Sequence, residues 1–174
     1  NMIAKNLATN LNIKLNTRIV TLRKEAKWQL FSEQNTPYSG VDWVISTAPS
    51  PQTADLLPKE FQYHDEIKTV QMRSCFSLML GFSEPLDLEF EAAHITNSDL
   101  SWLAVNSHKP RRTEPYTLLI HSSEEYAKAH INDDQDEVLQ HLCFETSRII
   151  GCDVFDADYK TVHGWLYANN AKRD

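Results

Sequence analysis

The pattern of apolar positions in the first third of the chain predicts a helix and a small sheet. Apolar residues recur at helical spacing from Met2 to Leu11, which predicts a first helix. Short extended runs follow it, and their β-branched and aromatic residues favour strands. These runs cover residues 13–15, 18–23, 27–32 and 41–47. Together they predict a small antiparallel sheet.

The second part of the chain predicts a larger sheet. Residues 70–82 are rich in apolar side chains, which is typical of a long strand buried on part of both faces. Three further extended pieces follow the loop at 85–91, and one more precedes the end of the chain. They cover residues 94–96, 101–105, 116–121 and 159–167. This set predicts a mixed or antiparallel sheet.

Helices are predicted at three further places. Pro51 begins a short helix that Pro58 stops, and residues 59–68 form a second helical turn. A longer helix begins with Asn132 or Asp133 as its cap and closes at Gly151. Its inner stripe comprises Val138, Leu142, Cys143, Ile149 and Ile150. The fold class is therefore α+β: a small antiparallel sheet, then a larger mixed or antiparallel sheet with flanking helices. We place the domain boundary near Pro58, which gives domains 1–58 and 59–174.

Composition and charge narrow the function classes. The 174 residues carry a net charge of −7, which disfavours broad electrostatic capture of nucleic acid. No apolar run is long enough to cross a membrane and no secretory signal opens the chain. The three cysteines form no C-x-x-C pair, and the seven histidines lack metal-ligand spacing, so we expect no disulfide framework and no metal. The cytoplasm is the expected compartment.

The sequence lacks the motifs typical of nucleotide binding and of a catalytic serine nucleophile. The four glycines lie too far apart for G-x-G-x-x-G or a P-loop, whose glycines let backbone approach phosphate oxygens. The nucleophile pattern G-x-S-x-G is also missing, which disfavours hydrolytic chemistry. The chain therefore has no dinucleotide fingerprint of its own, and no catalytic residue is assigned.

Three stretches each have a structural and a functional interpretation. "VDWVISTAPSPQTADLL" (41–57) is a buried strand with a tight turn into a helix, or a place where small residues let a nucleotide approach the backbone. "NSHKPRR" (106–112) is a solvated basic loop, or an anion site that uses Lys109 and Arg112. "VHGWLYA" (162–168) places three ring-bearing residues on one strand face, as plain packing or as the wall of a pocket for a planar ligand. Those residues are His163, Trp165 and Tyr167, and Trp102 in "LSWLAVNS" extends the wall.

The ordered segments resemble a known family. "NMIAKNLATNLNIKLNTRIVTLRKEAKWQLFSE" followed by "VDWVISTAPSPQTADLL" is similar to the middle of FAD-dependent oxidoreductases of the amine-oxidase and renalase-like group. "MRSCFSLMLGF", "LSWLAVNSHKPRR", "YTLLIHSSEEYAKAHI" and "VHGWLYA" continue this resemblance in the family's order. The bacterial renalase-like branch is the most similar.

The resemblance implies a function and a role for each segment. Val20, Thr47, Ala48 and Pro49 would contact FAD, and residues from about 71 to 167 would form the substrate domain. The flavin would accept a hydride from an amine or a reduced nicotinamide-like substrate. The implied substrate pocket comprises Trp102, Lys109, Arg112, His163, Trp165 and Tyr167.

The chain departs from the family's pattern in several places. The glycine-rich fingerprint and a later FAD-binding segment are missing, so we expect a fragment that is inactive alone. Arg111 replaces the glycine of a loop that usually reads K-P-G-R, and Gly164 and Leu166 stand where arginines are usual. Two alternatives stay open. One is a non-catalytic interaction domain, or a subunit that docks on a separate nucleotide-binding partner. The other is an anion-binding module that uses Lys109 and Arg112.

Overall fold

The chain folds into two compact units, residues 1–70 and 71–174. The computed structural model describes residues 2–112 and 115–171. The division falls after Val70, whereas the sequence placed it near Pro58. The reason is that α2 (Ser50–Leu56) packs on α3 (His64–Lys68), which keeps the segment after Pro58 with the first unit.

The first unit is built around a small sheet. Three strands pair antiparallel in the order β1-β2-β3: β1 (Ile19–Lys24), β2 (Trp28–Ser32) and β3 (Pro37–Val41). Helix α2 packs on β1, and Leu22 and Ala54 are the buried apolar residues among the described part of this unit. The predicted small antiparallel sheet is confirmed, although its third strand covers residues 37–41 instead of the predicted 41–47.

Two strands predicted in the first unit do not form. Residues 13–15 are irregular, and helix α1 (Met2–Leu7) ends before the predicted Leu11. Residues 42–47 are irregular as well, with Trp43 85% and Ile45 86% exposed. Val41 pairs with Trp28, the first residue of β2, so the chain beyond Val41 has run past the end of its neighbour. A strand forms only where a neighbouring backbone can accept and donate its hydrogen bonds, so this apolar segment stays irregular.

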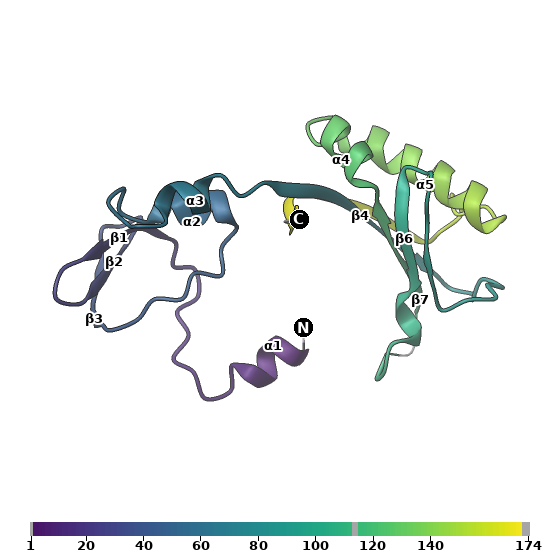
Figure 1. The fold of residues 1–174 in the computed structure, drawn as a ribbon. Helices are drawn as coiled ribbons and strands as arrows, with labels where there is room; N and C mark the ends of the chain where they lie inside the picture. The colour runs from purple at the N-terminus through teal and green to yellow at the C-terminus, as the bar shows by residue number, and fades with distance from the viewer. Residues whose placement is uncertain (1, 113–114, 172–174) are drawn as a thin grey trace. The chain divides into compact units, whose positions relative to one another are not determined.

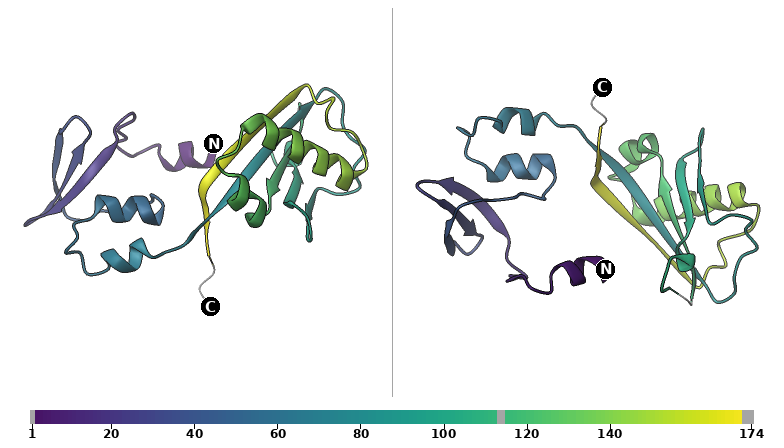
Figure 2. Two further views of the ribbon diagram at one scale, coloured as in Figure 1. Left: turned by 90° about the horizontal axis from the view of Figure 1, so that it is seen from above. Right: turned by 60° about the horizontal axis from the view of Figure 1, so that its bottom comes forward.

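The second unit contains a five-stranded antiparallel sheet in the order β5-β6-β7-β4-β8 (Figures 1 and 2). The strands are β4 (Met72–Phe82), β5 (Ala92–His94), β6 (Leu100–Val105), β7 (Tyr116–Ser122) and β8 (Tyr159–Asn170). The last strand returns beside β4, as Figure 2 shows. The predicted α+β fold with a larger antiparallel sheet is confirmed.

Two helices cover one face of this sheet (Figure 1). Helix α4 (Glu124–His130) begins at Ser123, whose side chain accepts a hydrogen bond from the Tyr126 amide; the sequence did not predict this helix. Helix α5 (Gln135–Ile150) is capped by Asp134 rather than by the predicted Asn132 or Asp133, and it ends as predicted at Gly151 with φ 73°. A short 3₁₀ turn, η1 (Asn106–His108), follows β6.

The core of the second unit lies between the sheet and these helices. Alternate residues of β4, namely Phe76, Leu78, Leu80 and Phe82, are buried, as are Leu118 and Ile120 of β7. Val138, Leu142 and Cys143 of α5 pack against them, and Ile149 and Ile150 are partly buried at the end of the stripe. Within the described part of the second unit, no helix covers the opposite face of the sheet, which is referred to below as the open face.

Candidate functional site

A row of imidazole, indole and hydroxyl groups crosses the open face of the large sheet. The strand register pairs His94 with Trp102, Trp102 with His121, His121 with Ser77, and Ser77 with His163. The row therefore uses one residue from each of the five strands. At the usual spacing between strands it spans roughly 20 Å. These side chains can offer hydrogen bonds and flat apolar surfaces to a ligand.

A cavity of about 730 Å³ lies on this face and belongs entirely to the second unit. It is lined by Arg73, Ser74, Cys75, Ser77, His94, Ser101, His121, Ser122, Glu124, Trp165, Tyr167, Ala168 and Asn169. Its volume falls in the range of small-molecule sites.

The indole of Trp165 forms one wall of the cavity. Its Nε1–H donates a hydrogen bond to Ser77 Oγ at 3.2 Å, and Ser77 is buried beneath it. The ring of His163 meets the indole edge-on, with centroids 4.4 Å apart. Alternation along the strand predicted that Trp165 and Tyr167 share a face, and both line the cavity. His163 supports the wall through its contact with Trp165.

The remaining predicted pocket residues lie at other positions. Trp102 stands in the cross-strand row but does not line the cavity. Lys109 and Arg112 are exposed in the turn after η1 and also lie outside the cavity lining. In that turn Arg112 N–H donates to Lys109 C=O at 3.1 Å, and Arg111 adopts φ 64°. A proline at the second position of a turn and a positive φ at the third position are typical of a type II turn. Such a turn favours glycine at the third position, which Arg111 occupies here.

Burial keeps two groups of the cavity uncharged. It lowers the pKa of His121, and the charge of Lys109 lowers it further, so the imidazole is neutral near neutral pH. Burial also raises the pKa of the Cys75 thiol. Hydrogen bonds with Ser122 lower this pKa, but their effect is smaller. A protonated thiol is a poor nucleophile, so the cavity favours binding and orientation over attack by cysteine.

One ion pair contributes the charged groups of the cavity. Arg73 and Glu124 meet at 3.0 Å between their side-chain nitrogen and oxygen atoms. Among the described residues that line the cavity, Glu124 is the only one with a carboxylate, and its partner Arg73 balances its charge. The site therefore lacks an unpaired acid for a cationic ligand.

Sequence reasoning missed His94, His121 and Cys75. Each lies on the open face because of strand pairing between distant segments. The alternation of "YTLLIHS" could have placed His121 opposite the buried Leu118 and Ile120. No local pattern indicates that β7 pairs with β6 and β4, or that β5 pairs with β6.

The predicted cofactor residues all lie in the first unit. Val20 is 40% exposed on β1, Thr47 is exposed, and Ala48 and Pro49 are half-buried. The carbonyls of Ala48 and Pro49 accept hydrogen bonds from Thr53, which fixes the entry to α2. The backbone of residues 42–47 forms no hydrogen bond with the described part of the chain. Small residues and free amides leave room for a ligand there.

Two other features bear on the class of site. The described residues include no group of three or more His, Cys, Asp or Glu that could hold a metal ion. Among the same residues, no helix combines the length and apolar character that a membrane span requires.

Comparison with known proteins identifies the fold. No protein-family model matches the sequence. A protein assigned as a protoporphyrinogen oxidase from Exiguobacterium sp. matches 98% of this chain with a TM-score of 0.74 and 17% identity. The chain shares its fold. A redesigned putrescine oxidase matches 92% of the chain (TM-score 0.70, 14% identity), and reduced UDP-galactopyranose mutase matches 96% (TM-score 0.68, 14% identity). The chain spans 39%, 36% and 39% of these three proteins, so it corresponds to part of each.

Proposed function

We propose that this chain is part of an FAD-dependent oxidoreductase of the amine-oxidase group, and that the full-length protein binds FAD. The observation that carries the proposal is the fold, shared over 92% of the chain or more with two proteins named as oxidases. A third protein of this fold is known in a reduced state, which supports a redox-active cofactor. The sequence segments quoted above favour the renalase-like branch within this group.

The first unit suits a cofactor-binding role. A dinucleotide needs backbone that it can approach closely, and residues 42–47 offer unpaired amides next to the small residues Ser46, Thr47 and Ala48. In the proposal, Val20 and residues 47–49 contact FAD. The remaining contacts come from segments that this chain does not contain.

The second unit suits substrate binding. A bound flavin would supply the hydride acceptor. Trp165, held by Ser77, would orient a flat substrate, while neutral His121 would accept a hydrogen bond from it. These groups would act by positioning and by excluding water.

The charges of the cavity bear on the substrate class. Amines and reduced nicotinamide-like rings are the two candidates. A polycationic amine would find Glu124 already paired with Arg73, and Lys109 near enough to act on His121. We therefore favour an uncharged planar ring, which the aromatic and imidazole groups can stack on and hydrogen-bond.

The visible spectrum of the full-length protein, purified without added cofactor, tests the proposal. We expect the absorption bands of oxidised flavin, and their bleaching when a reducing substrate is added without oxygen. A colourless protein that also fails to take up FAD would contradict the proposal.

A pair of variants then tests the cavity. Trp165 is 51% exposed and its neighbour Leu166 is 52% exposed, so the two side chains are exposed to a similar fraction. In the full-length enzyme, Trp165→Ala should raise KM roughly 3- to 10-fold through lost stacking, whereas Leu166→Ala should leave KM unchanged. Equal effects from both variants would show that the cavity is not the substrate site.

A non-catalytic interaction domain is the alternative. The exposed apolar side chains of the first unit, such as Trp43 and Ile45, are the observation that favours it. A full-length protein without flavin that captures a separate nucleotide-binding partner would support this alternative.

A further inference from the structure

A second cavity of the second unit lies where the pairing of β4 with β8 is irregular. Its volume is about 370 Å³. Arg73 pairs with Asn169 and Cys75 pairs with Trp165, so β8 carries extra residues over this stretch. Bulges of this kind redirect side chains and are frequent beside binding sites. Leu166, from the bulged part of β8, lines the cavity.

One face of helix α4 forms a wall of this cavity. Glu124, Lys128 and Ile131 line it, and their spacing along the chain places them on the same side of the helix. Leu166 adds a second aliphatic side chain to the lining. The cavity therefore combines charged groups with an apolar area.

The guanidinium of Arg73, which also lines the cavity, is only partly engaged. Its Nη1 nitrogen meets an oxygen of Glu124 at 3.0 Å. Its Nε atom is buried and has no hydrogen-bond partner, the single such case among the side-chain atoms of the described residues. Buried N–H groups nearly always have a partner in folded proteins. A ligand in the cavity would supply the acceptor that this N–H lacks.

Basic groups outnumber acidic ones in the cavity. Its lining contains Arg73 and Lys128 but a single carboxylate, that of Glu124. Glu124 pairs with Arg73, and the exposed Lys128 forms no ion pair with the described part of the chain. The excess of one positive charge matches a carboxylate better than a phosphate monoester, which carries about 1.5 to 2 negative charges at neutral pH.

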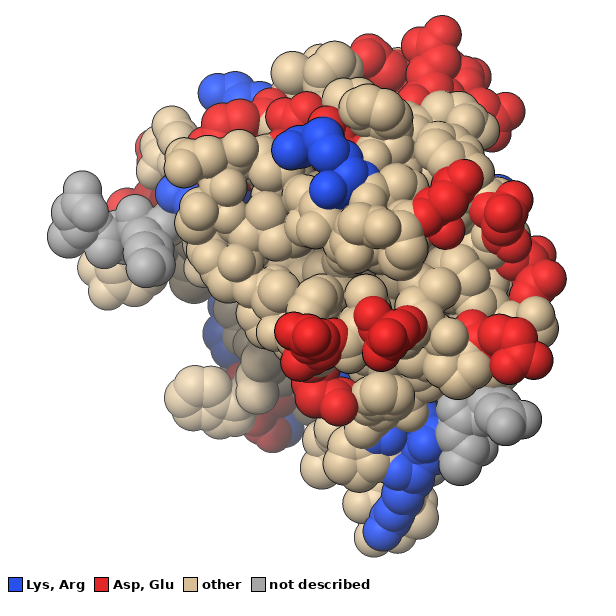
Figure 3. Space-filling model, turned by 90° about the vertical axis from the view of Figure 1, so that its right-hand side faces the viewer, with Lys and Arg blue, Asp and Glu red and all other residues tan. Residues whose placement is uncertain are grey.

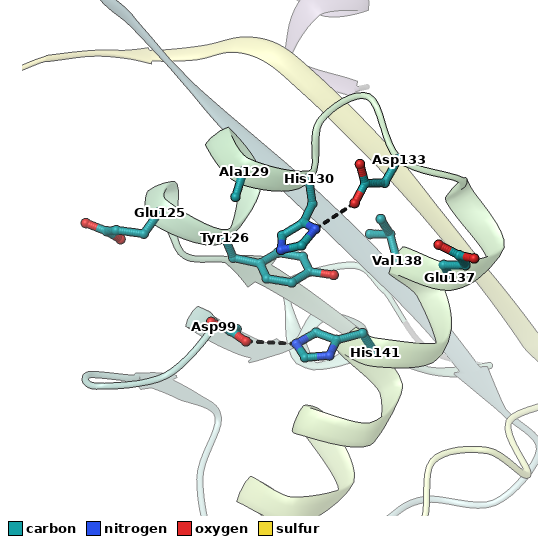
Figure 4. A pocket seen from close by; sticks show the side chains of 9 residues that line it. All are labelled: Asp99, Glu125, Tyr126, Ala129, His130, Asp133, Glu137, Val138 and His141. Atoms are coloured by element: carbon teal, nitrogen blue, oxygen red, sulfur yellow. Dashed lines mark hydrogen bonds and ion pairs between the residues drawn. The ribbon is translucent and has the colours of Figure 1, made fainter.

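This excess of positive charge contrasts with the rest of the molecule. The net charge is −7, and Figure 3 shows a face on which acidic side chains are widespread and basic ones few. Figure 4 shows a hollow between α4 and α5 that is lined by acidic residues and by no lysine or arginine. His130 and His141 already pair with two of those acids. Because the net charge repels anions at long range, an anion must be held beside β8 by short contacts.

We propose that the cavity beside the β8 bulge binds the carboxylate of a small aliphatic acid. The Nε–H of Arg73 donates to a carboxylate oxygen, and the ammonium of Lys128 pairs with the same group. The edge of a guanidinium that contains Nε matches the two oxygens of a carboxylate. The aliphatic chain packs on Ile131 and Leu166. The inference does not rest on the proposed oxidoreductase function, since these contacts require neither flavin nor turnover.

Calorimetric titration of the full 174-residue chain with hexanoate and with hexanamide tests the proposal. The two probes share an aliphatic chain and differ in charge. Hexanoate should bind saturably at 1:1 stoichiometry, and hexanamide should bind roughly tenfold more weakly because it lacks the charge-assisted hydrogen bond. Equal binding of both probes would overturn the proposal, as would tighter binding of butyl phosphate than of hexanoate.

Two variants assign the binding to named groups. Arg73→Lys keeps the positive charge but removes the Nε–H, so it should weaken hexanoate binding roughly tenfold and leave hexanamide binding unchanged. Lys128→Gln removes an exposed cation, a change that the fold tolerates, and should weaken hexanoate binding roughly threefold. Hexanoate binding that survives both substitutions would belong to another site and would overturn the proposal.

Arg112→Gln is the matched control. Arg112 is exposed in the basic turn that the sequence favoured as an anion site, and it does not line this cavity. The substitution removes the same charge as Lys128→Gln and should leave hexanoate binding unchanged. Equal weakening by the two substitutions would show that net charge alone controls binding, and would overturn the proposal.

Discussion

Arg111 occupies a backbone conformation that a side chain disfavours. It stands third in the turn Lys109–Arg112 with φ 64°, where glycine carries no steric penalty. Arg111→Gly should relieve about 1–2 kcal/mol of strain, offset by about 0.4–1 kcal/mol from the freer unfolded chain. We expect a net gain of roughly 0.5–1 kcal/mol in the free energy of unfolding, measured by urea denaturation.

The matched control at this position is Arg111→Ala. It removes the same charge but keeps a β-carbon, so the strain should persist and stability should not rise. If both variants gained equally, the gain would come from lost charge in this basic turn rather than from the backbone.

His121 gives the open face a dependence on pH. Its pKa in the folded chain is lowered from the usual 6.5, first by burial and then by Lys109. The unfolded chain therefore binds this proton more tightly than the folded chain does. The stability associated with a neutral His121 is present above pH 6.5 and is lost as pH falls through the lowered folded-state pKa.

His121→Gln should remove this dependence. We expect the stability difference between wild type and variant, measured by urea denaturation across this pH range, to shift in favour of the variant on acidification. A difference that stays constant from neutral to acidic pH would contradict the prediction.

At the scale of elements, the approach of β8 to the helices depends on Gly164. A β-carbon at this position would lie 3.0 Å from Cε1 of Phe76 and 3.3 Å from Cδ1 of Ile131. Phe76 is buried and held edge-on against Tyr126, so it cannot easily move aside. Gly164→Ala should therefore cost about 1–3 kcal/mol, measured by thermal or urea denaturation.

A double-mutant cycle isolates this crowding. Phe76→Leu removes the ring that the new methyl group meets, so Gly164→Ala should cost less in that background. An equal cost in both backgrounds would place the effect in the strand backbone instead.

The sequence predicted elements well where the deciding information is local. Alternation in β7 and β8 and the end of α5 at Gly151 all follow from neighbouring residues. Helix α4 has only seven residues, too few for a periodic signal to stand out. Residues 42–47 look like a strand, but whether a strand forms depends on a partner that no local pattern reveals.

The candidate site shows the same limit. Trp165 and Tyr167 were predicted to share a surface because they alternate on one strand. His94 and His121 join the site through pairings between strands far apart in sequence, and register of that kind cannot be read from one strand alone. Lys109 and Arg112 were favoured for their charge, but the turn places them outside the cavity lining.

At the scale of the whole molecule, the two units differ in the size of their hydrophobic cores. Every residue of the main hydrophobic cluster lies in residues 71–174. In the first unit, Leu22 and Ala54 are the buried apolar residues of its described part. Because this core is so small, burial of apolar side chains offsets little of the conformational entropy that the first unit loses on folding.

Separate expression of the two units tests this difference. Residues 71–174 should unfold in one cooperative urea transition, because their core is self-contained. Residues 1–70 should show a broad, weakly cooperative change in circular dichroism. A sharp transition in the shorter piece would contradict the prediction.

The irregular segment 42–47 has a consequence for proteolysis. A protease needs an extended, accessible backbone, and the backbone of this segment forms no backbone hydrogen bond with the described part of the chain. Chymotrypsin accepts large aromatic side chains in its specificity pocket, and Trp43 is among the most exposed residues of the chain. An early cut after Trp43 would separate the three-stranded sheet from α2 and α3 while leaving the second unit whole. Any ligand that covers this backbone would slow that cut, so the rate of digestion reports on its occupancy.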